Sequence, residues 1–263
     1  MTRGRAVKWV AGFLLSVVAG NADPVAVRHP QGYLHGYVVL KDLDDKVLAS
    51  GDLIQTVAGG RITDALTLHF KDGSLYQETS AFSQRRTYRL LTYKQVRKGP
   101  AFKTQETLTF DTSTGKVDIE HTDQDGKVKT ISDKLTLPPD LANGILPTLL
   151  LDVDPKVETT LSMLASTPNP RLVKLKISAG EQDSFSIGGA GTKATHYVMK
   201  IDIGGVTGVV AKVVGKQPPP VHFWVAAGNA PVFLKSEGQL FEDGPIWRIE
   251  MASPVWPKTS QKQ

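Results

Sequence analysis

Cysteine is absent from all 263 residues of the chain. Disulfide bonds, thiol catalysis, zinc–thiolate sites and lipid attachment through a cysteine are therefore excluded. A chain of this size can bury about 70 to 75% of its unfolded surface, so it can fold around a large core without covalent crosslinks.

No apolar run reaches the roughly 18 to 20 residues that cross a bilayer. The run at residues 9–18 has the flanks of an export signal, with basic side chains before it and small ones after it: Arg3, Arg5, Lys8, Gly20 and Ala22. This pattern predicts a signal peptide over residues 1–22, removed near Ala22, with a short membrane anchor as the alternative. The mature chain is then exported, periplasmic or extracellular, and lacks a transmembrane segment.

A concentrated basic face is also missing. Removal of residues 1–22 takes away three basic side chains and no acidic one, which lowers the formal net charge from +5 to +2. Nucleic-acid-binding proteins usually combine a strong basic patch with stacking aromatic residues. We therefore expect no nucleic-acid partner.

Motifs that would mark catalysis or a cofactor do not occur. The six histidines lack the spacing that places two imidazoles on one metal, and there is no Gly-x-Ser-x-Gly. Gly189, Gly191 and Ala194 have dinucleotide-binding spacing but precede a strand pattern instead of a helix. We expect no metal, no cofactor and no assignable catalytic residue, and we favour a non-enzyme.

What the chain does contain is alternation of apolar and polar residues, interrupted by turn dipeptides such as Gly59-Gly60, Asp72-Gly73 and Asp125-Gly126. This predicts a mostly all-β protein with a curved antiparallel sheet, half-barrel or barrel-like. We expect a single β-rich domain over 23–256, with a first meander at 32–135, a second at 157–251, and a disordered tail at 257–263. One sheet and a sandwich both fit the pattern.

The stretch from Pro138 to Leu151 separates the two meanders. Its apolar residues recur at helical spacing, Pro139 and Asp140 are suited to opening a helix, and Asn143-Gly144 and Pro147 argue against one regular helix. We predict two short helical turns, here called the plug (residues 138–151), whose apolar side must lie on the sheet.

The apolar residues of the plug and of both meanders can line a cavity for an apolar ligand or form a closed core. The candidate lining residues are Leu141, Ile145, Leu146, Leu149, Leu150, Tyr88, Tyr93, His196 and Trp224. His196 and His222 are the histidines of most interest, although a structural role is the simpler interpretation for each.

Several segments resemble a family of exported bacterial proteins of unknown function over most of residues 32–256. They are Asp140-Leu141-Ala142-Asn143-Gly144, Ala194-Thr195-His196-Tyr197, Gly205-Val206-Thr207-Gly208-Val209, Gly215-Lys216-Gln217-Pro218-Pro219 and Gly244-Pro245-Ile246-Trp247-Arg248-Ile249-Glu250. More distantly, the chain resembles the lipoprotein carriers of the Lol system, in which a curved antiparallel sheet holds an apolar ligand under short helices. The resemblance supplies no catalytic residue, and the lack of cysteine departs from carriers that are lipid-anchored.

These observations lead to three functional hypotheses. The first is a non-enzymatic envelope protein that binds a lipid, an acyl chain or a lipoprotein segment between sheet and plug. The second is a structural or adaptor protein with a closed core, which contacts another envelope protein through an exposed strand edge. The third is an envelope hydrolase whose two acids, or Ser and His, come from distant positions.

Overall fold

The computed structural model describes residues 24–166, 169–187, 190–203, 217–226 and 228–252. They form fourteen strands and one helix, α1 (Leu146–Leu150). The strands are β1 (Leu34–Lys41), β2 (Val47–Ala58), β3 (Arg61–Phe70), β4 (Leu75–Gln84), β5 (Tyr88–Lys98), β6 (Gln105–Asp111), β7 (Lys116–Thr122), β8 (Val128–Lys134), β9 (Thr159–Ala165), β10 (Arg171–Ile187), β11 (Ala190–Asp202), β12 (Val221–Ala226), β13 (Val232–Gln239) and β14 (Ile246–Ala252).

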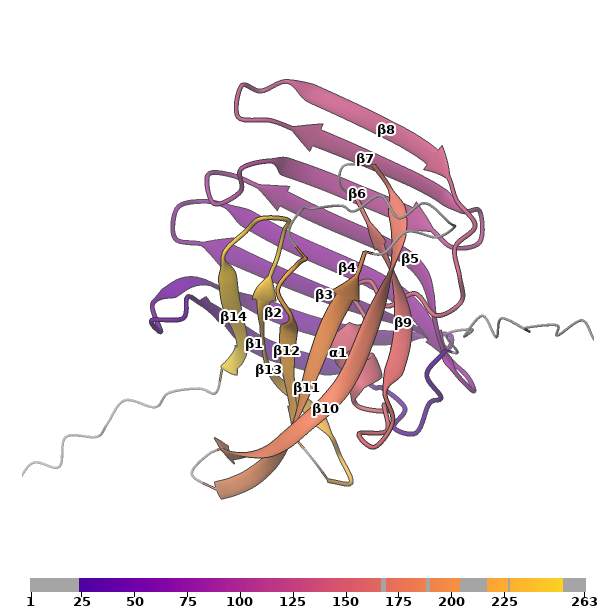
Figure 1. Cartoon of the computed structure of the whole chain (residues 1–263), viewed down its shortest axis with the longest axis vertical. Helices are drawn as coiled ribbons and strands as arrows, with labels where there is room; N and C mark the ends of the chain where they lie inside the picture. The colour runs from indigo at the N-terminus through magenta and orange to yellow at the C-terminus, as the bar shows by residue number, and fades with distance from the viewer. Residues whose placement is uncertain (1–23, 167–168, 188–189, 204–216, 227, 253–263) are drawn as a thin grey trace, which may run out of the picture.

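All fourteen strands belong to one antiparallel sheet, in the order β8-β7-β6-β5-β4-β3-β2-β1-β14-β13-β12-β11-β10-β9. The sheet has a first half, β1 to β8, and a second half, β9 to β14. The first and last strands of the chain join these halves, with Val38 of β1 opposite Met251 of β14. The sheet is strongly curved and does not close, so β8 and β9 are its two edges (Figure 1). This confirms the prediction of a mostly all-β protein with a curved antiparallel sheet, and it decides for one sheet over a sandwich.

The hairpins follow from their turn residues. Gly59 and Gly60, between β2 and β3, both have a positive φ, which a two-residue turn of the hairpin type requires and which glycine adopts without strain. On either side of this turn the strands keep regular register, from Ala58 opposite Arg61 to Ala49 opposite Phe70.

The plug has less helix than the sequence predicts. Only α1 is helical, and Pro147 lies in its first turn, where the missing N–H is no loss. Asp140 does not open a helix: its carboxylate accepts a hydrogen bond from the Ser162 hydroxyl at 2.8 Å, and Leu141 forms a bridge with Ser162 at the edge of β9. A strand-like contact with the sheet therefore replaces the expected first helical turn.

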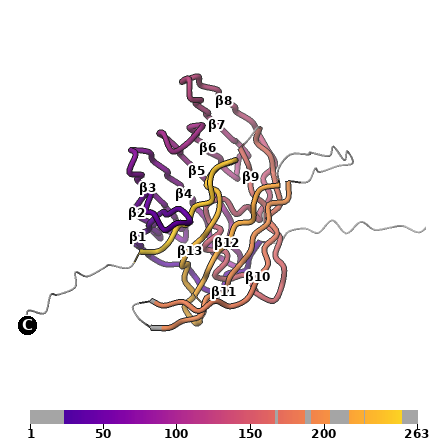
Figure 2. The backbone as a smooth tube through the Cα atoms, turned by 60° about the vertical axis from the view of Figure 1, so that its left-hand side comes forward, coloured from indigo at the N-terminus to yellow at the C-terminus, as the bar shows by residue number. Residues whose placement is uncertain are grey.

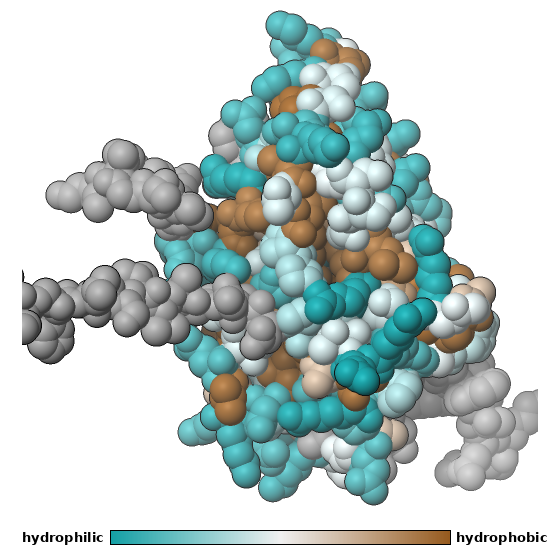
Figure 3. All heavy atoms as spheres, turned by 90° about the vertical axis from the view of Figure 1, so that its right-hand side faces the viewer, coloured by the Kyte–Doolittle hydropathy of each residue, from teal (hydrophilic) through white to brown (hydrophobic). Residues whose placement is uncertain are grey.

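The two halves of the sheet face each other (Figure 2). One apolar cluster contains side chains from β3 to β7, from the plug and from β9 to β12, so the plug packs against both halves. A second cluster joins β1 to β4 with β14 and includes Phe70, Phe102 and Trp247. A view of one side shows apolar side chains gathered near the middle of that face, between polar ones (Figure 3).

Two predictions fall outside the described residues: the signal peptide at 1–22 and the tail at 257–263. Within the described ranges, no helix has the length and apolar character to cross a membrane.

Candidate ligand-binding cavity

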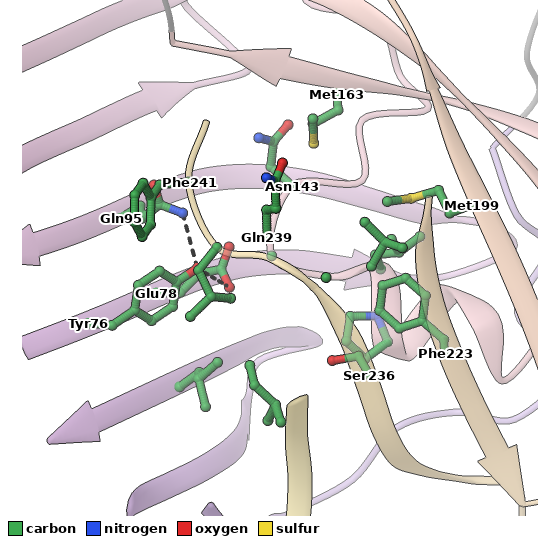
Figure 4. A pocket seen from close by; sticks show the side chains of 18 of the residues that line it. Tyr76, Glu78, Gln95, Asn143, Met163, Met199, Phe223, Ser236, Gln239 and Phe241 are labelled. Carbon is green, nitrogen blue, oxygen red and sulfur yellow. Dashed lines mark hydrogen bonds between the residues drawn. The ribbon is translucent and has the colours of Figure 1, made fainter. Parts of the chain in front are cut away.

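Between the two halves of the sheet lies a cavity of about 1680 Å³. The first half contributes apolar side chains from β2, β3 and β6, the second half contributes them from β9, β11 and β12, and the plug contributes three more. They include Leu53, Leu66, Leu108, Leu146, Pro147, Leu151, Met163, Met199 and Phe223. Figure 4 shows Met163, Met199 and Phe223 around this space, opposite Tyr76 and Glu78.

Strand register explains which side chains face the cavity. Leu66, Glu78, Gln95 and Leu108 lie directly opposite one another across β3, β4, β5 and β6, and so form one row on the same face of the sheet. The outer members of this row are leucines, but its middle is polar. A carboxylate and an amide therefore interrupt the apolar wall of the cavity.

Glu78 is held by two tyrosine hydroxyls. The Tyr93 hydroxyl donates to Glu78 Oε1 at 2.5 Å, and Gln95 Nε2 donates to the Tyr93 hydroxyl oxygen at 3.1 Å. The Tyr76 hydroxyl donates to Glu78 Oε2 at 3.4 Å and accepts a hydrogen bond from Gln95 Nε2 at 3.1 Å (Figure 4). Burial raises the pKa of Glu78, and the hydrogen bonds from Tyr93 and Tyr76 oppose this rise. The side chain nevertheless borders the cavity, so a ligand can reach it.

Asp64, two positions from Leu66 on the same face of β3, is the second acid of the cavity wall. Its carboxylate accepts hydrogen bonds from Gln55 Nε2 at 2.6 Å and from Thr148 Oγ1 of the plug at 3.2 Å. The pKa of Asp64 is raised to about 6. Burial is the largest cause of this rise and the charge of Glu78 adds to it, whereas the two hydrogen bonds oppose it. The acid thus links the first half of the sheet to α1.

Arg97, the buried cation of the cavity wall, is paired within the protein. Its guanidinium lies 2.8 Å from Glu106 Oε1, and both side chains are almost fully enclosed. Glu106 Oε2 also contacts His121 Nδ1 at 3.2 Å and accepts a hydrogen bond from the Ser166 hydroxyl at 2.8 Å. Ser166 follows β9, so this group of polar side chains connects the two halves of the sheet.

The structure separates the candidate lining residues into three groups. Leu146 and Tyr93 border the cavity. Leu141, Ile145, Leu149, Leu150 and Tyr88 are buried in the apolar cluster around the plug and are not among the cavity-lining residues. The Tyr88 hydroxyl donates to Asp152 Oδ2 at 2.7 Å, which connects β5 to the residue that follows the plug.

His196 and Trp224 form the third group and lie away from the cavity. Tyr197 and Phe223 point into the core, so their neighbours His196 and Trp224 point to the opposite face of the sheet. There the His196 ring stacks on Trp224 with centroids 4.5 Å apart, and His196 Nε2 lies 2.8 Å from His222 Nδ1. Burial and the neighbouring His222 lower the pKa of His196. Whether any of the nine candidates binds a ligand stays a prediction.

Sequence reasoning missed the polar residues of the cavity wall, Asp64, Glu78, Gln95 and Arg97. A signal was present, because each occupies a strand position whose alternation assigns it to the inner face. Glu106 of β6 shows the same pattern. In the sequence, an acidic residue at an inward position only weakens the prediction of an apolar strand face. Within the described ranges, His, Cys, Asp and Glu side chains form no group of three or more that could hold a metal ion.

No family model and no curated protein matches the chain. Among solved structures, the chain is similar to the hypothetical lipoprotein YmcC from Escherichia coli (K12), with 8% identity and a TM-score of 0.35 over 86% of this chain and 91% of that one. A likeness at this level carries no argument about function. The resemblance to the Lol carriers therefore stays a prediction.

Proposed function

We propose that the protein is an exported envelope protein that binds an apolar molecule, such as a lipid, an acyl chain or a lipoprotein segment, between the two halves of its sheet. The observation that carries this proposal is the cavity of about 1680 Å³ with a largely apolar lining. Cavities for drug-sized ligands measure roughly 300 to 1,000 Å³, so this one has room for a larger molecule.

Burial of a hydrocarbon chain supplies enough free energy for such binding. A sixteen-carbon chain gains roughly 12 kcal/mol at about 0.8 kcal/mol per CH₂. Association subtracts about 4 kcal/mol or more for lost translational and rotational freedom. The remainder corresponds to a dissociation constant on the order of 1 μM for the most favourable case.

The adaptor hypothesis has one observation in its favour. β8 is an edge strand whose side chains are mostly exposed, so its unpaired backbone groups are available to another chain. The adaptor hypothesis also requires a closed, packed core, and the cavity argues against such a core. We therefore rank ligand binding above the adaptor role.

The hydrolase hypothesis gains support from Asp64 and Glu78, since two acids with raised pKa values border one cavity. However, both carboxylates already accept hydrogen bonds from the protein, and the opposite side of the cavity presents apolar side chains such as Met199 and Phe223. A hydrolase would cleave model glycosides or esters and lose that activity in Glu78→Gln. We expect no such activity in the wild-type protein.

The decisive experiment compares a filled cavity with an open one. Wild-type protein, purified from its native compartment, is analysed by lipid extraction and mass spectrometry, and is titrated with an uncharged fluorescent apolar probe. Met163→Trp places a large ring at the cavity wall, and Leu172→Trp introduces the same ring at an exposed position of β10 as a control.

We expect a co-purifying apolar molecule in the wild type, and probe binding that weakens about tenfold or more in Met163→Trp but not in Leu172→Trp. A ligand-free wild type that also fails to bind the uncharged probe would refute the proposed function. Equal probe binding by both tryptophan variants would refute the assignment to this cavity.

A further inference from the structure

The polar groups of the cavity wall are concentrated on neighbouring strands of the first half. Asp64 on β3, Tyr76 and Glu78 on β4, and Tyr93 and Gln95 on β5 border the same cavity, and we call these five residues the acidic patch. The opposite wall, from β9 to β13, faces the patch with Met199, Phe223 and the neutral Ser236 (Figure 4). A ligand inside the cavity therefore meets apolar surface on one side and carboxylates on the other.

The charges inside the cavity do not balance. Arg97 is the buried cation of the lining, and Glu106 already neutralises it at 2.8 Å. In the part of the chain that the structure describes, no salt bridge reaches Asp64 or Glu78. Their hydrogen-bond donors are a neutral amide and neutral hydroxyls. The interior thus carries two acids for which the protein supplies no counter-ion.

The remaining charged residues of the lining are exposed and cancel one another. Two are cations and two are anions: Lys103, Arg171, Glu242 and Asp243. Exposed charges are screened by water and salt, so they contribute little to selection inside the cavity. The acidic patch dominates the electrostatics of the interior.

We propose that the cavity selects amphiphiles whose polar end is a cationic hydrogen-bond donor, such as a primary ammonium, and that Glu78 and Asp64 hold this end while the apolar wall holds the chain. This inference rests on the proposed function. An ammonium supplies the missing counter-ion and donates three hydrogen bonds, and a carboxylate accepts up to about four. In a water-poor cavity such charge-assisted hydrogen bonds are strong.

The same residues disfavour amphiphiles whose polar end is anionic or neutral. A fatty-acid carboxylate would place a further acidic group beside Asp64 and Glu78, where like charges repel in low dielectric. A neutral alcohol can donate one hydrogen bond but supplies no charge. Burial raises the pKa values of both patch acids, and a bound ammonium would lower them again.

The test is displacement of a bound fluorescent apolar probe by dodecylamine, dodecanol and dodecanoate near neutral pH, each kept below its critical micelle concentration. The full chain is used as wild type, as Glu78→Gln and Asp64→Asn, and as Glu242→Gln, which removes an exposed acid of the lining and serves as the matched control. Circular dichroism establishes that each variant is folded, and Asp64→Asn carries the test should Glu78→Gln fail to fold.

We expect the amine to displace the probe at concentrations about tenfold or more below those of the alcohol, with dodecanoate weakest. Glu78→Gln and Asp64→Asn should each reduce the preference for amine over alcohol about tenfold, and Glu242→Gln should not change it.

Equal displacement by the three compounds, or preference for dodecanoate, would overturn the inference while leaving the proposed function standing. An amine preference that survives in both patch variants would overturn the role of the patch. A wild-type protein that binds neither the probe nor any of the three compounds would overturn the proposed function itself.

Discussion

Two leucines of α1 test whether the plug holds the sheet together and where the cavity begins. Leu149 is 2% exposed and packs within the apolar cluster, whereas Leu146 is 8% exposed and borders the cavity. Both belong to the same short helix, so Leu149→Ala and Leu146→Ala remove the same atoms with the same effect on helix propensity. Any difference in stability comes from their surroundings.

The expected difference follows from the two contributions to a core truncation. Removing three carbon atoms loses roughly 2.4 kcal/mol of transfer free energy at about 0.8 kcal/mol each. A new cavity in a packed site adds to this, so Leu149→Ala should cost about 3 to 5 kcal/mol. Leu146 already has open space on one side, so its truncation creates little new void and should cost little more than the transfer contribution, about 2 to 3 kcal/mol.

The measurement is urea unfolding followed by circular dichroism, with free energies from linear extrapolation. The reasoning requires Leu149→Ala to be the more damaging of the two by about 1 kcal/mol or more. Equal losses would mean that the cavity does not reach Leu146. A loss below about 1 kcal/mol for Leu149→Ala would mean that the plug is not part of the core.

Three further predictions concern the polar wall and the plug. Glu106→Gln should cost about 3 to 5 kcal/mol in urea unfolding because it leaves the buried Arg97 unpaired, and Arg97→Met in the same background should recover part of the loss. Asp64 has a folded-state pKa near 6 against an ordinary value of 3.8, so its contribution to stability is present at low pH and is lost as the pH rises through 6. The stability of Asp64→Asn relative to the wild type should therefore improve by roughly 2 kcal/mol between about pH 4 and 7, and a flat difference would contradict the raised pKa. Gly144 has a φ of 67°, and a Cβ there would lie 2.0 Å from Ser80 Oγ, so Gly144→Ala should cost about 2 to 4 kcal/mol, a loss that a change in melting temperature would reveal.

The strands themselves could be predicted because their signals are local. Alternation over a few residues marks a strand, and dipeptides such as Gly59-Gly60 mark the turn that reverses it. The same locality explains the partial failure at the plug. Its helical spacing was real at Leu146 to Leu150, but Asp140 and Leu141 contact Ser162 of β9, a partner that no nearby residue reveals.

The amino-acid sequence by itself determined that the chain is built of antiparallel strands with an apolar insertion between two meanders, since periodicity and turn chemistry act within a few residues. Only the tertiary structure decided that β1 pairs with β14, that the plug leaves a cavity beside it, and that Glu78 and Asp64 face this cavity. These features depend on contacts between distant positions, such as Asp64 with Thr148, whose 84-residue separation no local pattern encodes. The chemistry of the cavity comes from those contacts, because the inward face of a strand becomes a binding surface only where the opposite wall stands away from it.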